Sequence, residues 1–218
     1  MAAAEQVRIP VAEGEAVRGL WLDGPRGVYA FAHGAGAGMQ HAFMKDVAVR
    51  LQARGIATLR FDFPYITEGR RLPPRAHTLT GVLRAAVEYA RGRAAGRPVW
   101  AGGKSMGGRV ASMAEAARPL GVVGLVFLGF PLHPAKRPGV ERADHLSDVK
   151  VPMRFLSGTR DALARRDLLA PAVAGLGDSA ELHWIESADH GFGVLVRSGR
   201  TRADVLDEIS ERVAAWIE

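Results

Sequence analysis

Short apolar runs alternate along the chain with longer segments whose apolar residues recur at helical spacing. The runs predict strands over residues 7–9, 16–22, 28–32, 56–61, 99–102, 122–128, 151–157 and 182–185. The helical spacing predicts helices over residues 43–51, 79–90, 109–117 and from about 201 onward. This alternation predicts an α/β fold in which helices flank both faces of a mostly parallel central sheet.

Local signals refine the ends of these elements. Gly55 ends the helix over 43–51, and Thr201 and Asp204 are placed to form a capping box at the last helix. The first two strands are expected at the edge of the sheet, and residues 64–77 and 131–150 are expected to be irregular. No repeat or linker interrupts the pattern, so we expect a single domain over residues 1–218.

The most specific motif is Gly103-Lys104-Ser105-Met106-Gly107, which fits the pattern Gly-x-Ser-x-Gly. A predicted strand precedes it and a predicted helix follows it. In such a turn the serine adopts a strained conformation, and a side chain two residues before or after it would collide with neighbouring backbone. The motif therefore predicts Ser105 as a nucleophile on a sharp strand-to-helix turn.

A phosphate-binding loop is the competing interpretation, because Gly-Lys-Ser also ends that motif. The motif requires a glycine five residues before Gly103, and Pro98 occupies this position. Proline has no backbone N–H for a phosphate, and no glycine-rich loop precedes the lysine. We therefore favour the nucleophile.

A serine hydroxyl is a weak nucleophile that needs a base to remove its proton and an acid to orient that base. Asp161 follows the strand over 151–157, and His190 follows the strand over 182–185. Both are expected, like Ser105, at the carboxyl edge of a parallel sheet, where ligands of such sheets bind. The sequence predicts Ser105, His190 and Asp161 as nucleophile, base and acid.

Other residues compete for two of these roles. Asp161 could instead cap the helix that follows it. Asp189 is a second acid, although it adjoins His190 and would struggle to reach that ring. His183 lies within a strand pattern and His33 precedes the nucleophile, so both are weaker candidates for the base.

An oxyanion hole is the third requirement. Met106 directly follows the nucleophile, and its backbone N–H is one expected donor. The second donor is expected in residues 33–38, whose glycines let backbone N–H groups turn inward. Either Ala35 or Gly36 can supply it, and we favour Ala35. A flexible connector is the alternative interpretation of this segment.

With these motifs the chain resembles the α/β-hydrolase superfamily, on its dienelactone-hydrolase-like side. The resemblance is greatest to a small branch that includes the hydrolase-like domain of a subunit of the NSL chromatin acetyltransferase complex and a testis-expressed homologue. The Ser, Asp and His motifs are common to the superfamily, whereas the Phe-Pro-Tyr and Phe-Pro-Leu-His-Pro stretches are more specific to the branch. The matching stretches are residues 33–36, 61–65, 69–71, 102–109, 129–134, 145–146, 158–161 and 189–190.

This resemblance implies a fold and a Ser-His-Asp triad but no substrate, because the branch has no settled one. Dienelactone hydrolases use a cysteine nucleophile, and this chain contains no cysteine. A serine favours esters or related acyl compounds. Hydrolases of this fold often insert a helical lid after the strand that 122–128 matches, but residues 131–150 leave no room for one. We therefore expect an open site without a large lid domain.

Such a site is expected to accept a small acyl substrate. Arg70, Arg71 and Arg75 follow the strand over 56–61, and one of them could contact an anionic substrate group. An exposed arginine patch is the alternative. Gly36, Lys104 and His133 are expected near the substrate from their positions alone.

The amino-acid composition excludes several other classes of protein. The 218 residues carry a net charge of +6, but the arginines are scattered and no basic run with interleaved aromatics indicates nucleic-acid binding. No apolar stretch has the length of a membrane span, and the first residues lack the pattern of a signal peptide. Without cysteine there are no disulfides or thiolate metal sites. We expect a cytoplasmic enzyme without metal or cofactor, and nothing indicates its oligomeric state.

These inferences converge on a serine hydrolase that cleaves small esters through an acyl-enzyme. A non-catalytic interaction module with the same fold is a rival hypothesis, which the chromatin-linked relative makes credible. The intact set of Ser105, Asp161 and His190 argues against it. An acyltransferase or amidase would use the same residues, because pocket shape selects the acceptor.

Overall fold

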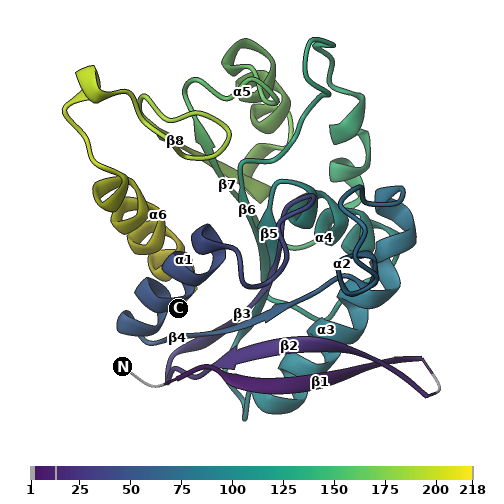
Figure 1. Cartoon of the computed structure of the whole chain (residues 1–218). Coiled ribbons are helices and arrows are strands. Elements are labelled where there is room, and N and C mark those ends of the chain that lie inside the picture. Colours follow the sequence, from purple (N-terminus) through teal and green to yellow (C-terminus); the bar gives the residue numbers. More distant parts are fainter. Residues whose placement is uncertain (1–2, 13, 218) are drawn as a thin grey trace.

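A central sheet of eight strands organises the computed structural model, which describes residues 3–12 and 14–217 (Figure 1). The strands lie in the order β1-β2-β4-β3-β5-β6-β7-β8. β2 is antiparallel to both of its neighbours, and the pairs from β4 to β8 are parallel. The strands are β1 (Glu5–Ala12), β2 (Glu15–Leu22), β3 (Gly27–Ala32), β4 (Ile56–Phe61), β5 (Val99–Lys104), β6 (Gly124–Leu128), β7 (Met153–Gly158) and β8 (Ala180–Ile185).

Burial follows the apolar pattern of each strand. All residues of β3, β4 and β6 are buried, as expected for continuous apolar runs in a parallel sheet. β1 lies at the edge and alternates exposed residues with Val7 and Ile9. The prediction of a second edge strand is wrong for β2, which lies between β1 and β4. Only residues 19–22 of β2 pair with β4, so its exposed first half reads like an edge strand.

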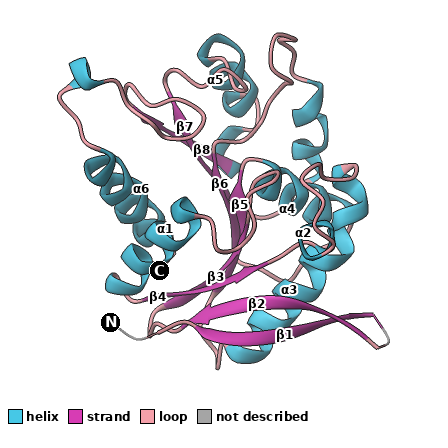
Figure 2. Ribbon diagram, viewed as in Figure 1, coloured by secondary structure: helices cyan, strands magenta, loops and turns pink. Residues whose placement is uncertain are grey.

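Helices cover both faces of the sheet (Figures 1 and 2). α1 (Ala42–Ala53) and α6 (Arg202–Trp216) pack on one face, and α3 (Thr80–Arg93), α4 (Met106–Ala117) and α5 (Arg166–Ala174) pack on the other. The predicted capping box of α6 is confirmed by reciprocal bonds between Thr201 and Asp204. Within the described residues, no helix has both the length and the apolar character needed to cross a membrane.

The two segments predicted to be irregular contain short helices. Residues 64–77 include α2 (Pro64–Thr67) and the start of the 3-10 helix η1 (Ala76–Leu79). Residues 131–150 include η2 (Glu141–Asp148), and two further 3-10 turns, η3 (Gly177–Ser179) and η4 (Val196–Ser198), flank β8. Between β6 and β7 the described residues form no helical layer over the sheet, as expected for a fold without a large lid.

The carboxyl ends of β3, β5, β7 and β8 meet at one edge because these strands are parallel. The segments that leave this edge carry His33, Ser105, Asp161 and His190. Side chains from four distant parts of the sequence are therefore brought to one edge of the sheet, where open α/β sheets bind their ligands.

Candidate active site

Ser105 lies on a sharp turn between β5 and α4, with φ of 51° and ψ of −115°. A positive φ is unfavourable for serine, so the surrounding backbone must hold this conformation. Gly103 and Gly107 show how this is done, because a Cβ on them would lie only 2.3 and 2.5 Å from the carbonyl oxygen of Ala32. The two glycines let β5 and α4 approach β3, which is the steric reason expected from the motif.

The loop after β8 carries His190, and Asp189 gives this loop its shape. The Asp189 carboxylate accepts hydrogen bonds from the N–H groups of Gly191 and Gly193, both at 2.8 Å. The Asp189 N–H donates to the Gly193 carbonyl at 2.9 Å. Asp189 is therefore a backbone support for the loop that presents His190.

Asp161 lies after β7, in a turn that packs against the loop after β8. Gly158 permits this approach, because a Cβ there would lie 2.2 Å from the carbonyl oxygen of Ala188. The same carbonyl accepts the Arg160 N–H at 2.9 Å. Asp161 Oδ1 accepts the Leu163 N–H at 2.8 Å, so the carboxylate also stabilises its own turn. The helix expected after it begins only at Arg166, in α5.

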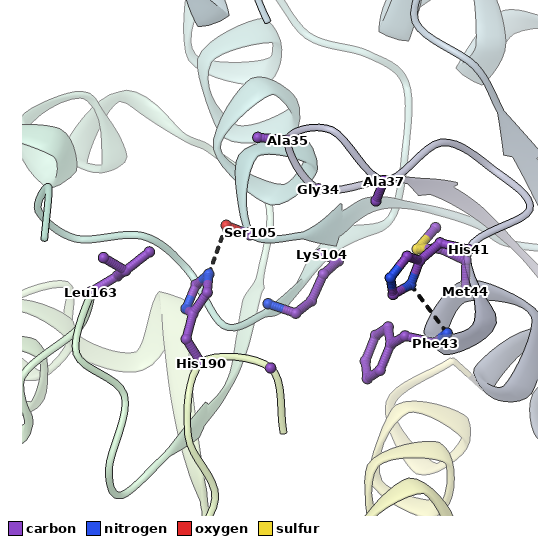
Figure 3. Close-up of a pocket in the computed structure, with 11 residues that line it drawn as sticks. Gly34, Ala35, Ala37, His41, Phe43, Met44, Lys104, Ser105, Leu163 and His190 are labelled. Carbon is purple, nitrogen blue, oxygen red and sulfur yellow. Dashed lines mark hydrogen bonds between the residues drawn. The ribbon is translucent and has the colours of Figure 1, made fainter. Parts of the chain in front are cut away.

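Ser105, His190 and Asp161 form a continuous hydrogen-bonded line. Ser105 Oγ lies 2.8 Å from His190 Nε2 (Figure 3), and His190 Nδ1 lies 2.8 Å from Asp161 Oδ2. The Asp161 side chain is completely buried, whereas that of His190 is 24% exposed. With Nδ1–H donating to the carboxylate, Nε2 is free to accept the serine proton.

The segment after β3 passes beside Ser105 and presents backbone N–H groups. A Cβ on Gly34 would lie 3.7 Å from that of Ser105. The Gly36 N–H already donates to the Tyr65 hydroxyl at 3.2 Å. Within the described residues the Ala35 N–H has no acceptor. Met106 is the first residue of α4, so its N–H has no partner inside the helix.

A cavity of about 330 Å³ opens beside Ser105 and His190 (Figure 3). The rings of Phe43 and Phe192 stack with centroids 5.6 Å apart and connect α1 to the loop after β8. In the described part of the chain no three carboxylate or imidazole groups form a cluster suited to a metal ion. The wall is mostly apolar and includes Gly34, Ala35, Ala37, His41, Phe43, Met44, Lys104, Leu163 and Gly191.

Among the described residues of this wall Lys104 is the only one with a side-chain amine, and it lies between His190 and Phe43 (Figure 3). Its Nζ lies 5.4 Å from the centroid of the Phe192 ring. Burial lowers the pKa of Lys104 to about 8, although the charges of Asp161 and Asp189 act in the opposite direction. Near neutral pH this amine is a cation, but one that loses its proton easily.

The other predicted binding residues, which are Gly36, Arg70, Arg71 and His133, are not among the described residues that line this cavity. Arg70 is exposed and pairs with Glu68, and Arg71 is also exposed. His133 is buried, with Nδ1 placed 2.9 Å from the next carbonyl oxygen and Nε2 accepting the Arg165 N–H at 3.3 Å. Its ring holds the backbone after β6.

Sequence reasoning did not identify His41, Phe43, Met44 or Leu163 as wall residues. Phe43 and Met44 follow the helical spacing of α1, which marks a residue as buried without saying that it faces a site. His41 caps α1 by accepting the Phe43 N–H at 3.2 Å. Leu163 stands two residues after Asp161, and this proximity to a candidate acid was the one available signal.

The chain matches the family model of the alpha/beta hydrolase domain over residues 25–218, and it therefore belongs to that family. The central sheet, the flanking helices and the turn at Ser105 are those of an α/β-hydrolase fold. The fold class predicted from the sequence is confirmed.

Several solved structures resemble the chain along almost its whole length. A dienelactone hydrolase from Anabaena variabilis is 25% identical, with a TM-score of 0.79 over 99% of this chain and 97% of that chain. An α/β serine hydrolase without a lid from Xanthomonas campestris is 20% identical, with a TM-score of 0.74 over 100% and 96%. An esterase domain from Rhodothermus marinus is 18% identical, with a TM-score of 0.72 over 99% and 98%. The dienelactone-hydrolase-like side of the superfamily and a hydrolase activity are thereby supported.

Proposed function

We propose that the chain is a serine hydrolase that cleaves small carboxylic esters. The observation that carries this proposal is the line of hydrogen bonds from Ser105 Oγ through His190 to Asp161, with both links at 2.8 Å. The strained turn at Ser105 supports it, because such strain persists only where surrounding structure enforces it. A serine with an adjacent base and a third orienting group is the arrangement that activates a hydroxyl for attack.

The proposed reaction has two halves. Ser105 Oγ bonds to the ester carbonyl carbon while its proton passes to His190 Nε2. The C–O bond to the alcohol then breaks, and the alcohol oxygen takes the proton from His190. Water repeats the attack on the acyl-enzyme, gives a proton to His190 and releases the acid as Ser105 regains its proton. Every proton and electron pair is thus handled by side chains and water, so the cycle requires no cofactor.

The negative oxygen of each tetrahedral intermediate needs two hydrogen-bond donors. We assign them to the N–H groups of Met106 and Ala35. The unused Ala35 N–H and the bond from Gly36 to Tyr65 support Ala35 over Gly36. Removal of one such donor typically costs about 3 kcal/mol of transition-state stabilisation.

The proposal includes the placement in the branch with the NSL-complex domain. The two stretches that are more specific to this branch each have a structural role here. Tyr65 of Phe-Pro-Tyr holds the Gly36 N–H, and His133 of Phe-Pro-Leu-His-Pro holds the Arg165 N–H. Both stretches therefore support loops at the carboxyl edge of the sheet.

A fluorophosphonate probe tests the activated serine directly, because it reacts with serines that have a working base. The wild type and the exposed control Ser147→Ala are expected to be labelled, whereas Ser105→Ala and His190→Ala are not. The same proteins are then compared in the hydrolysis of 4-nitrophenyl esters of increasing acyl length. The wild type and Ser147→Ala should be active, and kcat should fall by about 10⁴–10⁶-fold in Ser105→Ala. A folded wild type that takes no label and cleaves no ester would leave the chain as an interaction module.

A further inference from the structure

A second cavity of about 340 Å³ opens on another side of the nucleophile. It shares Ala35, Ser105 and Leu163 with the first cavity, but its walls exclude His190 and Lys104 among the described residues. The remaining walls come from the start of α4, from residues 73–76 before α3, and from the segment that carries η2. A substrate carbonyl at Ser105 therefore has two distinct directions in which its substituents can extend.

Three arginines line this second cavity, and its described wall contains no carboxylate. Arg75, Arg109 and Arg142 come from three separate segments. Arg109 is half-buried, and its Nε is completely buried without a hydrogen-bond partner in the described structure. Among the described residues, the Arg142 side chain has one hydrogen-bond acceptor, the Pro131 carbonyl oxygen at 3.4 Å. Two partly desolvated guanidinium groups thus lie beside the nucleophile with their donors largely unused.

This arrangement differs from that of Arg97, although Arg60 also has a buried Nε without a hydrogen-bond partner in the described structure. Arg97 is also largely buried, and it meets the Asp23 carboxylate at 2.8 Å. At Arg109, burial and the nearby charge of Arg142 both lower the pKa. Cations that are desolvated close to each other are unfavourable unless an anion neutralises them. The missing negative charge therefore points to a ligand.

We propose that this cavity binds an anionic group on the acyl part of the substrate, so that the preferred esters are monoesters of an acid with a second, terminal carboxylate or phosphate-like group. This inference rests on the proposed esterase function. Arginine forms paired hydrogen bonds with carboxylate and phosphate oxygens alike. Arg109 stands one helical turn after Ser105, about 6 Å along α4, so only a short chain separates the anion from the ester carbonyl.

The position of His190 determines whether the acyl half or the alcohol half of the ester lies in the second cavity. The alcohol oxygen must receive its proton from His190 Nε2. Because His190 lines the first cavity alone, the alcohol extends there, among Phe43 and Met44. The acyl chain then extends towards Arg109 and Arg142. The sequence suggested this role for Arg70, Arg71 or Arg75. Of these three, only the exposed Arg75 is among the described residues of the cavity wall, and we give the role to Arg109 and Arg142.

The test compares two 4-nitrophenyl esters with the same six-carbon acyl chain, the hexanoate and the adipate monoester. The wild type is expected to prefer the adipate monoester in kcat/KM by about tenfold or more. In Arg109→Met and Arg142→Met the adipate-to-hexanoate ratio should fall by a similar factor, while Arg109→Lys retains part of it. The matched control is Arg118→Met, an exposed arginine at the other end of α4, and it should keep the wild-type ratio. Ser105→Ala supplies the uncatalysed rate of each ester.

Two further substrates test which anion the site prefers and on which half of the ester the anion must lie. The 5-phosphonopentanoate ester, which has the same number of methylene groups as the adipate monoester, shows whether a phosphate-like group or a carboxylate is the better ligand. A hexanoate ester of 4-hydroxybenzoate carries its anion on the alcohol, and an arginine-dependent preference for that ester would overturn the acyl-side assignment.

Failure of this inference is distinguishable from failure of the esterase function. A wild type that cleaves the hexanoate but shows no arginine-dependent preference for either anionic ester overturns the anion site and leaves the esterase. A wild type that cleaves none of them, yet binds adipate by calorimetry with a loss in Arg142→Met, supports the site and overturns the esterase.

Discussion

The imidazole of His33 accepts a hydrogen bond at Nε2 from the backbone N–H of Phe63, at 3.2 Å, and so joins the ends of β3 and β4. Because Nε2 is the acceptor, Nδ1 carries the proton and donates to the Gly34 carbonyl oxygen at 2.7 Å. Burial lowers the pKa of His33, which keeps the ring neutral. His33 is thus a fixed support for the segment that presents the Ala35 N–H.

Replacement of this support should affect both stability and turnover. In His33→Ala the buried Phe63 N–H loses its partner, and we expect the free energy of unfolding to fall by about 1–3 kcal/mol. We also expect kcat on a neutral ester to fall, because the Gly34–Ala35 segment is no longer held. Urea unfolding and ester turnover measure the two effects. The control is His77→Ala, an exposed histidine, which should change stability by less than about 0.5 kcal/mol.

Asp161→Asn tests the role of the carboxylate, because asparagine keeps the size and shape of the side chain and removes its charge. The amide no longer favours the ring state in which Nδ1 donates and Nε2 accepts, so kcat should fall by about 10⁴. Circular dichroism should be unchanged. Asp178→Asn makes the same change at an exposed position and should leave turnover intact. A loss of less than about tenfold in Asp161→Asn would contradict the role assigned to this carboxylate.

Two Gly→Ala substitutions should change stability in opposite directions. At Gly107 the new Cβ would lie 2.5 Å from the Ala32 carbonyl oxygen, and the free energy of unfolding should fall by about 1–3 kcal/mol. A Cβ added at Gly92, near the end of α3, would have no neighbouring atom within 4 Å in the described structure. The better helix propensity of alanine should therefore raise the free energy of unfolding by about 0.5–1 kcal/mol. Denaturant titrations of both variants compare them directly. Equal effects would mean that the turn at Ser105 is not sterically enforced.

Lys104 should make stability depend on pH above neutrality. Its pKa is about 8 in the folded chain, whereas the pKa of an unfolded lysine is about 10.4. Between these values the unfolded chain binds the extra proton, so the free energy of unfolding rises with pH. Lys104→Met removes this contribution. The stability of the wild type relative to Lys104→Met should therefore increase from about pH 7 to about pH 10. A difference independent of pH would mean that the amine is not desolvated.

The sequence was informative where a role depends on local backbone geometry. Ser105 lies in a motif whose two glycines are needed because β5 and α4 pass close to the backbone of Ala32, and the five residues of the motif show that requirement. Asp161 and His190 follow predicted strands, and parallel strands end at a common edge, so their convergence could be anticipated.

Roles that depend on how separate segments pack could not be read in the same way. Arg109 and Arg142 reach one cavity from α4 and from η2, and the second lies in a segment expected to be irregular. The helical spacing of apolar residues predicts which face of a helix is buried, but it does not predict towards which cavity a polar side chain near the start of the helix points. Arg70 had the right charge, but its pairing with Glu68 follows from the local shape of the chain after α2.

Because of the order of strands in the sheet, the parts of the candidate active site should differ in how easily they unfold locally. Ser105 follows β5, which is hydrogen-bonded on both sides, whereas His190 follows β8, which lies at the edge of the sheet opposite β1 and pairs, among the described strands, with β7 alone. Proteins open first at such margins. Mild heating should therefore release the base while the nucleophile stays in position. Activity should then be lost before the fold is lost, and it should return on cooling because the turn at Ser105 stays folded.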